Sequence, residues 1–428
     1  MSIAIRDALL VTQDPDRTLL RGDVLIEGDR IAAVGKVREG ADLEIDASGD
    51  VVIPGMINAH THVSMTVMKG VADDLSFPDF LNRVFEIDAG RTQDDIAAGT
   101  RLGLMEMMAG GTTTFVELYY SLDVVARELE SAGLRGVLCW AVLDQELTTQ
   151  KGVPVENCRR FHQKFKDSDL VYPGVGPQGV YVCSDETLIK ASELSLEKEI
   201  PMTFHLSETR GEVYDYKEKV GMRPVEHLHG IGFLNNNCVA AHSAWLTLRE
   251  VRLLAENGVS VATCPVSNMK LATGGVAPIP EMQEAGVNVA IGTDGSSTNN
   301  SLDMFAEMKF LALLQKSNRW DATVLKAQEV LDSATINGAK ALGLGSEIGS
   351  IEVGKKADLV ILDGKAPNLN PFNMENVVSN LIYSASCLNV KTTICDGQPV
   401  YMDRQFRTLD RDEVLDDARR HFDQLIGL

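Results

Sequence analysis

Positive charge is scarce in this sequence of 428 residues. It contains 40 Lys and Arg against 61 Asp and Glu, which gives a formal net charge of −21 at pH 7. A surface this acidic repels nucleic acid and anionic membranes, so we expect neither as a partner. The composition instead fits a soluble, cytoplasmic globular protein with a small-molecule ligand, and we expect it to form a homo-oligomer.

Cysteine pairs, targeting segments and long apolar runs are also missing. The seven cysteines never form a C-x-x-C pair, which argues against both a disulfide framework and a cysteine zinc site. The first residues, MSIAIRDALLVTQDPD, have no basic segment followed by an apolar core, so no signal peptide is predicted. No uninterrupted apolar stretch approaches the roughly 20 residues that are needed to span a bilayer.

The two ends of the chain share a pattern of short strands and turns. Residues 23–35 (DVLIEGDRIAAVG) alternate apolar and polar positions around Gly28-Asp29, which predicts a hairpin. Residues 349–364 (GSIEVGKKADLVILDG) and 390–403 (VKTTICDGQPVYMD) have the same character. We therefore predict a small composite β domain from residues 1–52 and 346–428, the latter ending in a helix, with residues 53–345 inserted between them.

The inserted segment alternates strand-like and helix-like stretches. Its strand candidates are VVIPGMIN (51–58), GTTTFVEL (111–118), LRGVLCWAVLD (134–144), VYPGVGPQGV (171–180), PMTFHLSE (201–208), NNCVAAHSAWL (236–246), GVSVATCPVSN (258–268) and GVNVAIGTDGSS (286–297). Eight strands that alternate with helices predict an α/β fold of the (β/α)8 TIM-barrel type, with a doubly wound open sheet as the alternative. No G-x-G-x-x-G follows the first strand, and polar residues end many different strands, so the barrel is favoured.

Histidines and acids recur at the C-terminal ends of these predicted strands. In a barrel these ends converge on one mouth, where catalytic groups collect. Three imidazoles and one carboxylate suit Zn²⁺ or Fe²⁺ with one position left for water, and two further groups would then act as acid and base. The predicted metal ligands are His60, His62, His205 and Asp294, and the predicted acid/base groups are Glu208 and His242.

Each of these residues also has a simpler explanation. The pair His60 and His62 is a weak motif when taken alone. His205, flanked by apolar residues, fits a core histidine with satisfied hydrogen bonds, and Asp294 before Gly295 fits an ordinary turn. Their shared position at strand ends favours the site, because the other histidines lack that placement.

Several segments, in this order along the chain, resemble the metal-dependent amidohydrolase superfamily. They are PGMINAHTH, FHLSET, AAHSAWL and IGTDGSSTNN, supported by MTVMKGVADDLSFPDFL (65–81) and GSIEVGKKADLVILD. Within that superfamily they look like the branch of 5'-methylthioadenosine/S-adenosylhomocysteine deaminases, 5'-deoxyadenosine deaminases and triazine hydrolases. The resemblance implies a distorted (β/α)8 barrel with a composite β domain, and it implies the same ligand set. The modified lysine of binuclear members has no counterpart in VYPGVGPQGV, which implies one divalent metal per chain, zinc or iron.

The resemblance implies a hydrolase that deaminates adenosine-type nucleosides. The metal would supply water that ionises near neutral pH. Asp294 and His242 would accept its proton, and Glu208 would protonate a ring nitrogen before the amino group leaves as ammonia. One alternative is a hydrolase of another amino- or chloro-substituted heterocycle, such as a triazine, pterin or guanine. The other is an inactive scaffold, which the filled ligand positions argue against.

Substrate contacts are expected at further positions besides Glu208. Gln178 replaces a nucleoside-binding histidine of the family and still offers a donor and an acceptor. Trp140 stands where members that bind the homocysteine carboxylate have an arginine, which favours a smaller or apolar 5'-group. The ribose-binding glutamate of the family corresponds to Asp88 or, with a different local alignment, to Glu86.

Overall fold

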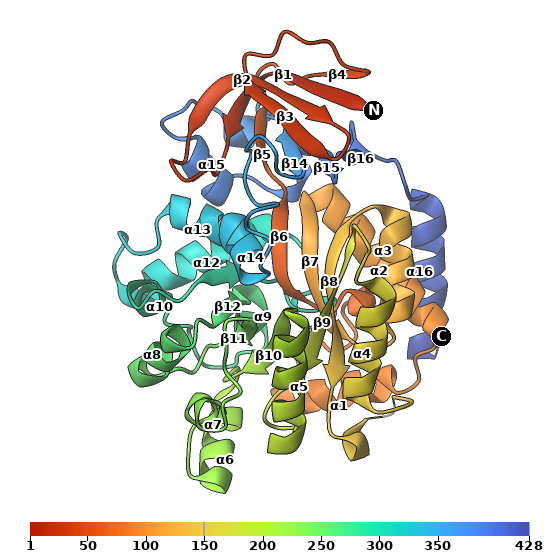
Figure 1. Cartoon of the computed structure of the whole chain (residues 1–428), viewed down its shortest axis with the longest axis vertical. Coiled ribbons are helices and arrows are strands. Elements are labelled where there is room, and N and C mark those ends of the chain that lie inside the picture. The colour runs from red at the N-terminus through yellow and green to blue at the C-terminus, as the bar shows by residue number, and fades with distance from the viewer. Residues whose placement is uncertain (149, 428) are drawn as a thin grey trace.

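The middle of the chain forms a parallel sheet of eight strands in sequence order, as the computed structural model shows for residues 1–148 and 150–427 (Figure 1). Each strand pairs with the next one along the chain, which is the order of a barrel and not of a doubly wound sheet. The strands are β6 (Met56–Thr61), β7 (Thr112–Tyr119), β8 (Arg135–Val142), β9 (Val171–Pro177), β10 (Met202–Leu206), β11 (Cys238–His242), β12 (Ser260–Thr263) and β13 (Val289–Ile291).

The barrel closes where the segment after β13 meets β6. The backbone N–H of Asp294 donates to the carbonyl of His60 at 2.9 Å. The side chain of Asn58 accepts from the N–H of Thr293 at 2.9 Å and donates to its hydroxyl at 2.7 Å. Gly292 makes this approach possible, since a Cβ there would lie 2.7 Å from the backbone nitrogen of His60. The predicted (β/α)8 barrel is therefore confirmed.

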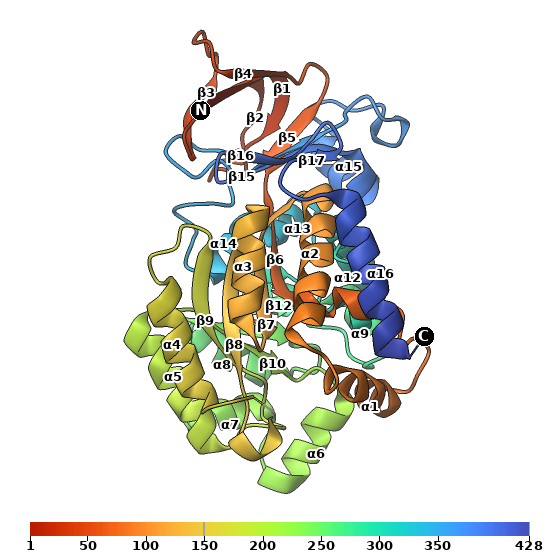
Figure 2. The ribbon, with the colours of Figure 1, turned by 90° about the vertical axis from the view of Figure 1, so that its right-hand side faces the viewer.

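Helices cover the outside of the barrel (Figures 1 and 2). Buried apolar side chains fill its interior. The helices that follow the barrel strands are α1 (Phe77–Asp88), α2 (Gln93–Gly110), α3 (Leu122–Ala132), α4 (Pro154–Phe165), α5 (Asp185–Lys198), α6 (Arg210–Val220), α7 (Pro224–Gly230), α8 (Leu248–Glu256), α9 (Pro265–Lys270), α10 (Ile279–Glu284), α11 (Ser296–Asn299), α12 (Met304–Arg319), α13 (Ala327–Ala334) and α14 (Ile336–Ala341). None of the helices within residues 1–148 and 150–427 is long and apolar enough to cross a membrane.

A second sheet combines strands from both ends of the chain. Its order is β17-β16-β15-β14-β5-β1-β2-β3, with β4 beside β1, and the two ends meet in the antiparallel pair of β5 and β14. The predicted hairpin of residues 23–35 is confirmed as β2 and β3. The strands are β1 (Ser2–Val11), β2 (Leu19–Glu27), β3 (Arg30–Gly35), β4 (Leu43–Asp46), β5 (Val51–Pro54), β14 (Leu359–Leu362), β15 (Val390–Cys395), β16 (Gln398–Met402) and β17 (Gln405–Phe406), and the helix α15 (Val377–Tyr383) lies between β14 and β15 in sequence.

The predicted strand VVIPGMIN is divided between the two sheets. Residues 51–54 form β5 in the small sheet, whereas β6 of the barrel begins at Met56. The break falls at Gly55, where a Cβ would lie 2.1 Å from the hydroxyl of Thr113. Gly55 also donates its N–H to the carbonyl of Asp358 at 2.8 Å, so the chain turns from one sheet into the other at this residue.

The terminal helix α16 (Arg411–Ile426) packs against the barrel helix α2 (Figure 2). Charged side chains hold this contact. Arg101 of α2 forms an ion pair with Asp417, and the ring of His421 lies 2.6 Å from Asp95. The C-terminal segment therefore contributes both to the small sheet and to the outer layer of the barrel.

A buried ion-pair network joins the small sheet to the base of the barrel. Arg135, the first residue of β8, is only 1% exposed and pairs with Asp358, just before β14 of the small sheet, and with Asp396, just after β15. Asp396 lies 3.0 Å from the ammonium group of Lys356, which in turn lies 2.6 Å from Asp29. Breaking such a pair leaves an uncompensated buried charge, whereas an exposed pair contributes little.

We expect Arg135→Gln to lower the free energy of unfolding by about 3–5 kcal/mol, because Asp358 would keep a buried charge without its cation. Arg159→Gln, which breaks an exposed pair with Glu197, is the matched control and should lower it by less than about 1 kcal/mol. Urea unfolding of the three proteins checks this expectation. Equal losses for the two variants would contradict it.

Candidate metal centre and active site

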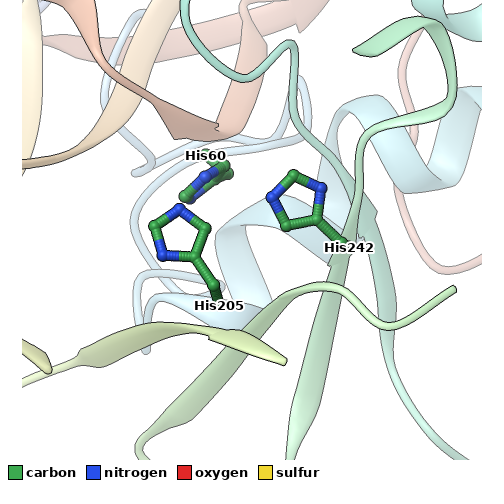
Figure 3. Close-up of side chains that lie close together, drawn as sticks. All are labelled: His60, His205 and His242. Carbon is green, nitrogen blue, oxygen red and sulfur yellow. The ribbon is translucent and has the colours of Figure 1, made fainter. Parts of the chain in front are cut away.

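The polar side chains at the strand ends meet at the C-terminal mouth of the barrel. His60, His205 and His242 project from three different strands toward one point (Figure 3). The ring centroid of His60 lies 5.0 Å from those of His62 and His205 and 5.4 Å from that of His242. Two triads have ligand atoms within 4.8 Å of one another, namely His60 with His205 and His242, and His60 with His62 and Asp294.

Asp294 completes the group of predicted ligands. Its Oδ1 lies 3.3 Å from Nε2 of His62 and 3.7 Å from Nε2 of His60. The Nε2 atoms of His62 and His205 are 3.4 Å apart. The other carboxylate oxygen accepts a hydrogen bond from the hydroxyl of Ser267 at 2.6 Å. The structure thus brings all four predicted ligand side chains together.

Backbone carbonyls orient two of the imidazoles. Nδ1 of His62 lies 2.7 Å from the carbonyl of Leu118, and Nδ1 of His205 lies 2.8 Å from the carbonyl of Gln178. Because a carbonyl can only accept, each Nδ1 carries the proton and leaves the lone pair of Nε2 directed at the centre. Sequence reasoning missed this role of Gln178, since backbone contacts leave no trace in residue type.

The donor set fits a divalent cation. Neither ring nitrogen of His60 has a hydrogen-bond partner among the described residues, although this side chain is fully buried. Native proteins rarely leave buried polar atoms unpaired, so a buried imidazole without a hydrogen-bond partner among the described residues, beside a carboxylate, fits a metal ligand. Neutral imidazole and ionised carboxylate are the forms that bind zinc or iron.

Burial sets these protonation states. Burial, followed by repulsion from the other imidazoles, lowers the pKa of His60 far below its usual value and that of His205 to about 3. Burial also lowers the pKa of His62, although Asp294 opposes the shift. For Asp294 burial acts in the opposite direction, but the neighbouring imidazoles outweigh it and hold the pKa of this carboxyl below its usual value.

Glu208 and His242 lie together beside this cluster. Nε2 of His242 is 3.8 Å from a carboxyl oxygen of Glu208, and its Nδ1 is 3.0 Å from Oδ1 of Asn268. Burial raises the pKa of Glu208 to about 7, so this group can give or take a proton near neutral pH. Burial lowers the pKa of His242, but the carboxyls of Glu208 and Asp294 outweigh it and raise that pKa overall.

Three residues that support these groups were not predicted from the sequence. Ser267 and Asn268 of α9 contact Asp294 and His242, and they follow the end of β12, which is the placement that identified the histidines. Glu212 accepts hydrogen bonds from the backbone N–H groups of Ser207 and Glu208, at 2.9 and 2.8 Å.

The structure separates the two candidates for the ribose contact. Asp88, at the end of α1, accepts hydrogen bonds from the hydroxyls of Tyr119 and Tyr120 and pairs with Arg91 at 3.1 Å. The ring of Tyr119 lies 6.1 Å from that of His62, so Asp88 borders the histidine cluster. Glu86 pairs with a neighbouring arginine on its own helix and its side chain is 71% exposed.

Trp140 is not brought to this site. Its ring packs against Phe161 of α4 at 5.7 Å, and its indole N–H donates to Gln150. Successive residues of a strand face opposite sides, and the neighbours Cys139 and Ala141 belong to the cluster inside the barrel. Trp140 therefore faces the helical layer, which corrects its expected position beside the substrate. The side chain of Gln178 is half-buried at the end of β9.

Comparison with known proteins agrees with this geometry. The chain is 38% identical over 430 residues to the 5'-deoxyadenosine deaminase of Methanosarcina mazei, a match that covers 99% of this chain and 98% of that protein. It is 40% identical over 416 residues to the 5-methylthioadenosine/S-adenosylhomocysteine deaminase of Pyrococcus furiosus, which covers 96% and 98%.

Solved structures show the same fold. An adenosine deaminase from Xanthomonas campestris with bound zinc superposes with a TM-score of 0.96 at 34% identity, over 100% of this chain and 99% of that one. An atrazine chlorohydrolase from Arthrobacter aurescens, complexed with zinc, shares the fold with a TM-score of 0.90 at 21% identity, over 98% and 100%. Residues 51–400 match the profile of the Amidohydrolase family. The chain therefore belongs to the amidohydrolase family.

Proposed function

We propose that this protein is a metal-dependent deaminase of adenosine-type nucleosides, of the 5'-methylthioadenosine, 5'-deoxyadenosine and S-adenosylhomocysteine class, which releases ammonia and an inosine-type product. The observation that carries this proposal is the buried cluster of three neutral imidazoles and one carboxylate with Glu208 beside it. The deaminase names of relatives at 38–40% identity over nearly the whole chain support the substrate class.

One divalent cation, zinc in preference to iron, would be held by His60, His62, His205 and Asp294. The ring nitrogens of His60, which have no hydrogen-bond partner among the described residues, and the Nε2 lone pairs of the other two imidazoles fit this assignment. When bound, the cation supplies the Lewis acidity that ionises water near neutral pH. The zinc in the adenosine deaminase from Xanthomonas campestris supports the choice of metal.

The surrounding residues move the protons. His242 and Asp294 accept a proton from the attacking water, and the water oxygen bonds to the ring carbon that bears the amino group. Glu208, protonated below a pH of about 7, donates its proton to the adjacent ring nitrogen. The carbon–nitrogen bond then breaks, and the amino group leaves as ammonia with a proton returned through the same residues.

Asp88 would bind the ribose. Its carboxylate borders the cluster and accepts hydrogen bonds from two tyrosines, so it can also accept from sugar hydroxyls. Gln178, whose backbone carbonyl lies 2.8 Å from Nδ1 of His205, would contact the nucleoside through its side-chain amide. Trp140 has no part in this assignment.

A screen for ammonia release tests the proposal. The zinc-reconstituted protein is offered 5'-deoxyadenosine, methylthioadenosine, S-adenosylhomocysteine, adenosine, guanine and an aminotriazine. We expect turnover of the adenosine derivatives at the highest kcat/KM. Turnover confined to guanine or the triazine would assign the protein to the alternative heterocycle hydrolases, and no turnover of any compound would favour an inactive scaffold.

Glu208→Gln should lower kcat by about 100-fold or more, because the amide cannot transfer a proton. Its zinc content should equal that of the wild type, since Glu208 is not among the ligands. Ammonia release and metal analysis together check this prediction, with Glu218→Gln on the exposed face of α6 as the control. A variant that deaminates at nearly the wild-type rate would remove Glu208 from the mechanism.

Zinc retention should not change between pH 7.5 and about pH 5.5. Protonation of an ordinary histidine, near pH 6.5, competes with metal binding and weakens it. Here the lowered pKa values of His60, His62 and His205 keep the rings neutral as the pH falls, and Asp294 stays ionised. Metal analysis after dialysis at each pH measures this. Release with a midpoint near pH 6.5 would show that burial does not control these groups.

Asp88→Asn should lower kcat/KM for a nucleoside by roughly 10- to 100-fold, the effect of losing a charged hydrogen bond. Glu86→Gln on the same helix should leave it unchanged, since that side chain faces solvent. Steady-state kinetics with one substrate for both variants decide between the two acids. The reverse order of effects would assign the ribose to Glu86.

A further inference from the structure

Glu117, a buried residue of β7, has its carboxyl group within hydrogen-bond distance of the residues on either side of His62. Its Oε2 accepts the backbone N–H of Val63 at 2.6 Å and lies 2.9 Å from the hydroxyl of Thr61. The next residue of the strand, Leu118, supplies the carbonyl that orients the ring of His62. Two consecutive residues of β7 thus hold the main chain and the side chain of one predicted ligand.

These side-chain contacts lie where the backbone pairing of β6 with β7 is irregular. β6 and β7 pair through Met56, Ile57, Asn58 and Thr61, and the register shifts twice along the way, the second time between Asn58 and Thr61. His60 lies within that second irregular stretch, and His62 lies just beyond the strand. Where backbone pairing is irregular, side-chain hydrogen bonds must set the path of the chain. The carboxyl of Glu117 provides such hydrogen bonds to the two residues that flank His62.

The hydrogen bonds around Glu117 require its protonated form. The hydroxyl of Thr61 also lies 2.8 Å from the carbonyl of Val116, but it has one proton to donate. Since the carbonyl can only accept, Thr61 donates to Val116 and receives the proton of the carboxyl. Oε1 of Glu117 is buried without a partner among the described residues, which disfavours a charge there. Burial correspondingly raises the pKa of this carboxyl to about 8.

We propose that Glu117 is a positioning residue of the metal centre, which fixes residues 61–63 and thereby aims the ring of His62 at the other ligands. This inference rests on the proposed metal site but not on the identity of the substrate. Partners that orient metal ligands typically change metal affinity by 10- to 100-fold when they are removed.

Two substitutions separate hydrogen bonding from volume. Val63 and Thr61 both contact Oε2, so the amide of Glu117→Gln can keep the hydrogen bond to Val63 or the one to Thr61 but not both in their present form, and its zinc affinity should stay within about 3-fold of the wild type. Glu117→Met keeps the volume but loses both hydrogen bonds, so its zinc affinity should fall by at least about 10-fold. Competition with a chromophoric chelator measures affinity without any substrate.

Glu250→Met is the matched control for loss of a buried acid. Glu250, in the first turn of α8, is also fully buried, and one of its carboxyl oxygens has no partner among the described residues. Its other carboxyl oxygen pairs with Arg223. The Glu250→Met variant should have a lower melting temperature than the wild type and an unchanged zinc affinity. The absorption bands of Co²⁺ bound in place of zinc should shift for Glu117→Met alone, because they report ligand geometry.

Thr61→Val keeps the inference testable if Glu117→Met does not fold, because it removes the hydroxyl between Glu117 and Val116 and should also weaken zinc binding. Wild-type affinity in Glu117→Met, or in Thr61→Val if only that variant folds, would overturn the inference. So would an equal loss in Glu117→Gln. A failed substrate screen with these affinity changes intact would refute the proposed substrate class and leave the role of Glu117 standing.

Discussion

The proposed metal centre depends on the closure of the barrel between its last and first strands. His60 belongs to β6, His62 lies just beyond its end, and Asp294 is the third residue after β13, so these side chains meet only if the two strands lie side by side. Gly292 permits that approach, because any side chain there would collide with the backbone of His60. The hydrogen bond from Asp294 to the carbonyl of His60 then couples closure of the ring to placement of the carboxylate.

Buried acids hold the loops around this mouth. Glu117 binds residues 61–63, Glu212 binds the backbone of residues 207 and 208, and Glu307 of α12 binds the N–H of Val266 and the side chain of Asn299. Burial raises the pKa of all three carboxyls. The imidazoles hold the pKa of Asp294 below its usual value, so carboxyls around the same mouth have their pKa values shifted in opposite directions.

Much of the fold, and the gathering of the candidate ligand side chains at one place, could be predicted from the sequence, because both follow from local pattern. Alternating strands and helices with polar strand ends predict a barrel mouth, and His60, His62, His205 and Asp294 do meet there. The inward or outward direction of Trp140 could not be read in the same way. A strand buried on both faces shows no alternation of polarity, so the pattern does not tell which residues face the helices. The contacts of Glu117 with Thr61 and Val63 could not be predicted from the sequence either, since they join segments more than 50 residues apart in the chain.

The backbone itself turns sharply where the site residues emerge. Ser207, His242 and Asp294 have φ values of +48°, +64° and +63°, in the left-handed region that side chains other than glycine seldom adopt. Such conformations persist only where surrounding contacts impose them. Here those contacts are the hydrogen bond from the N–H of Ser207 to the Glu212 carboxyl and the hydrogen bond from the N–H of Asp294 to the carbonyl of His60 in β6. An abrupt turn after a short strand delivers each side chain to the barrel axis, so the strain at these positions is a consequence of building one centre from separate strand ends.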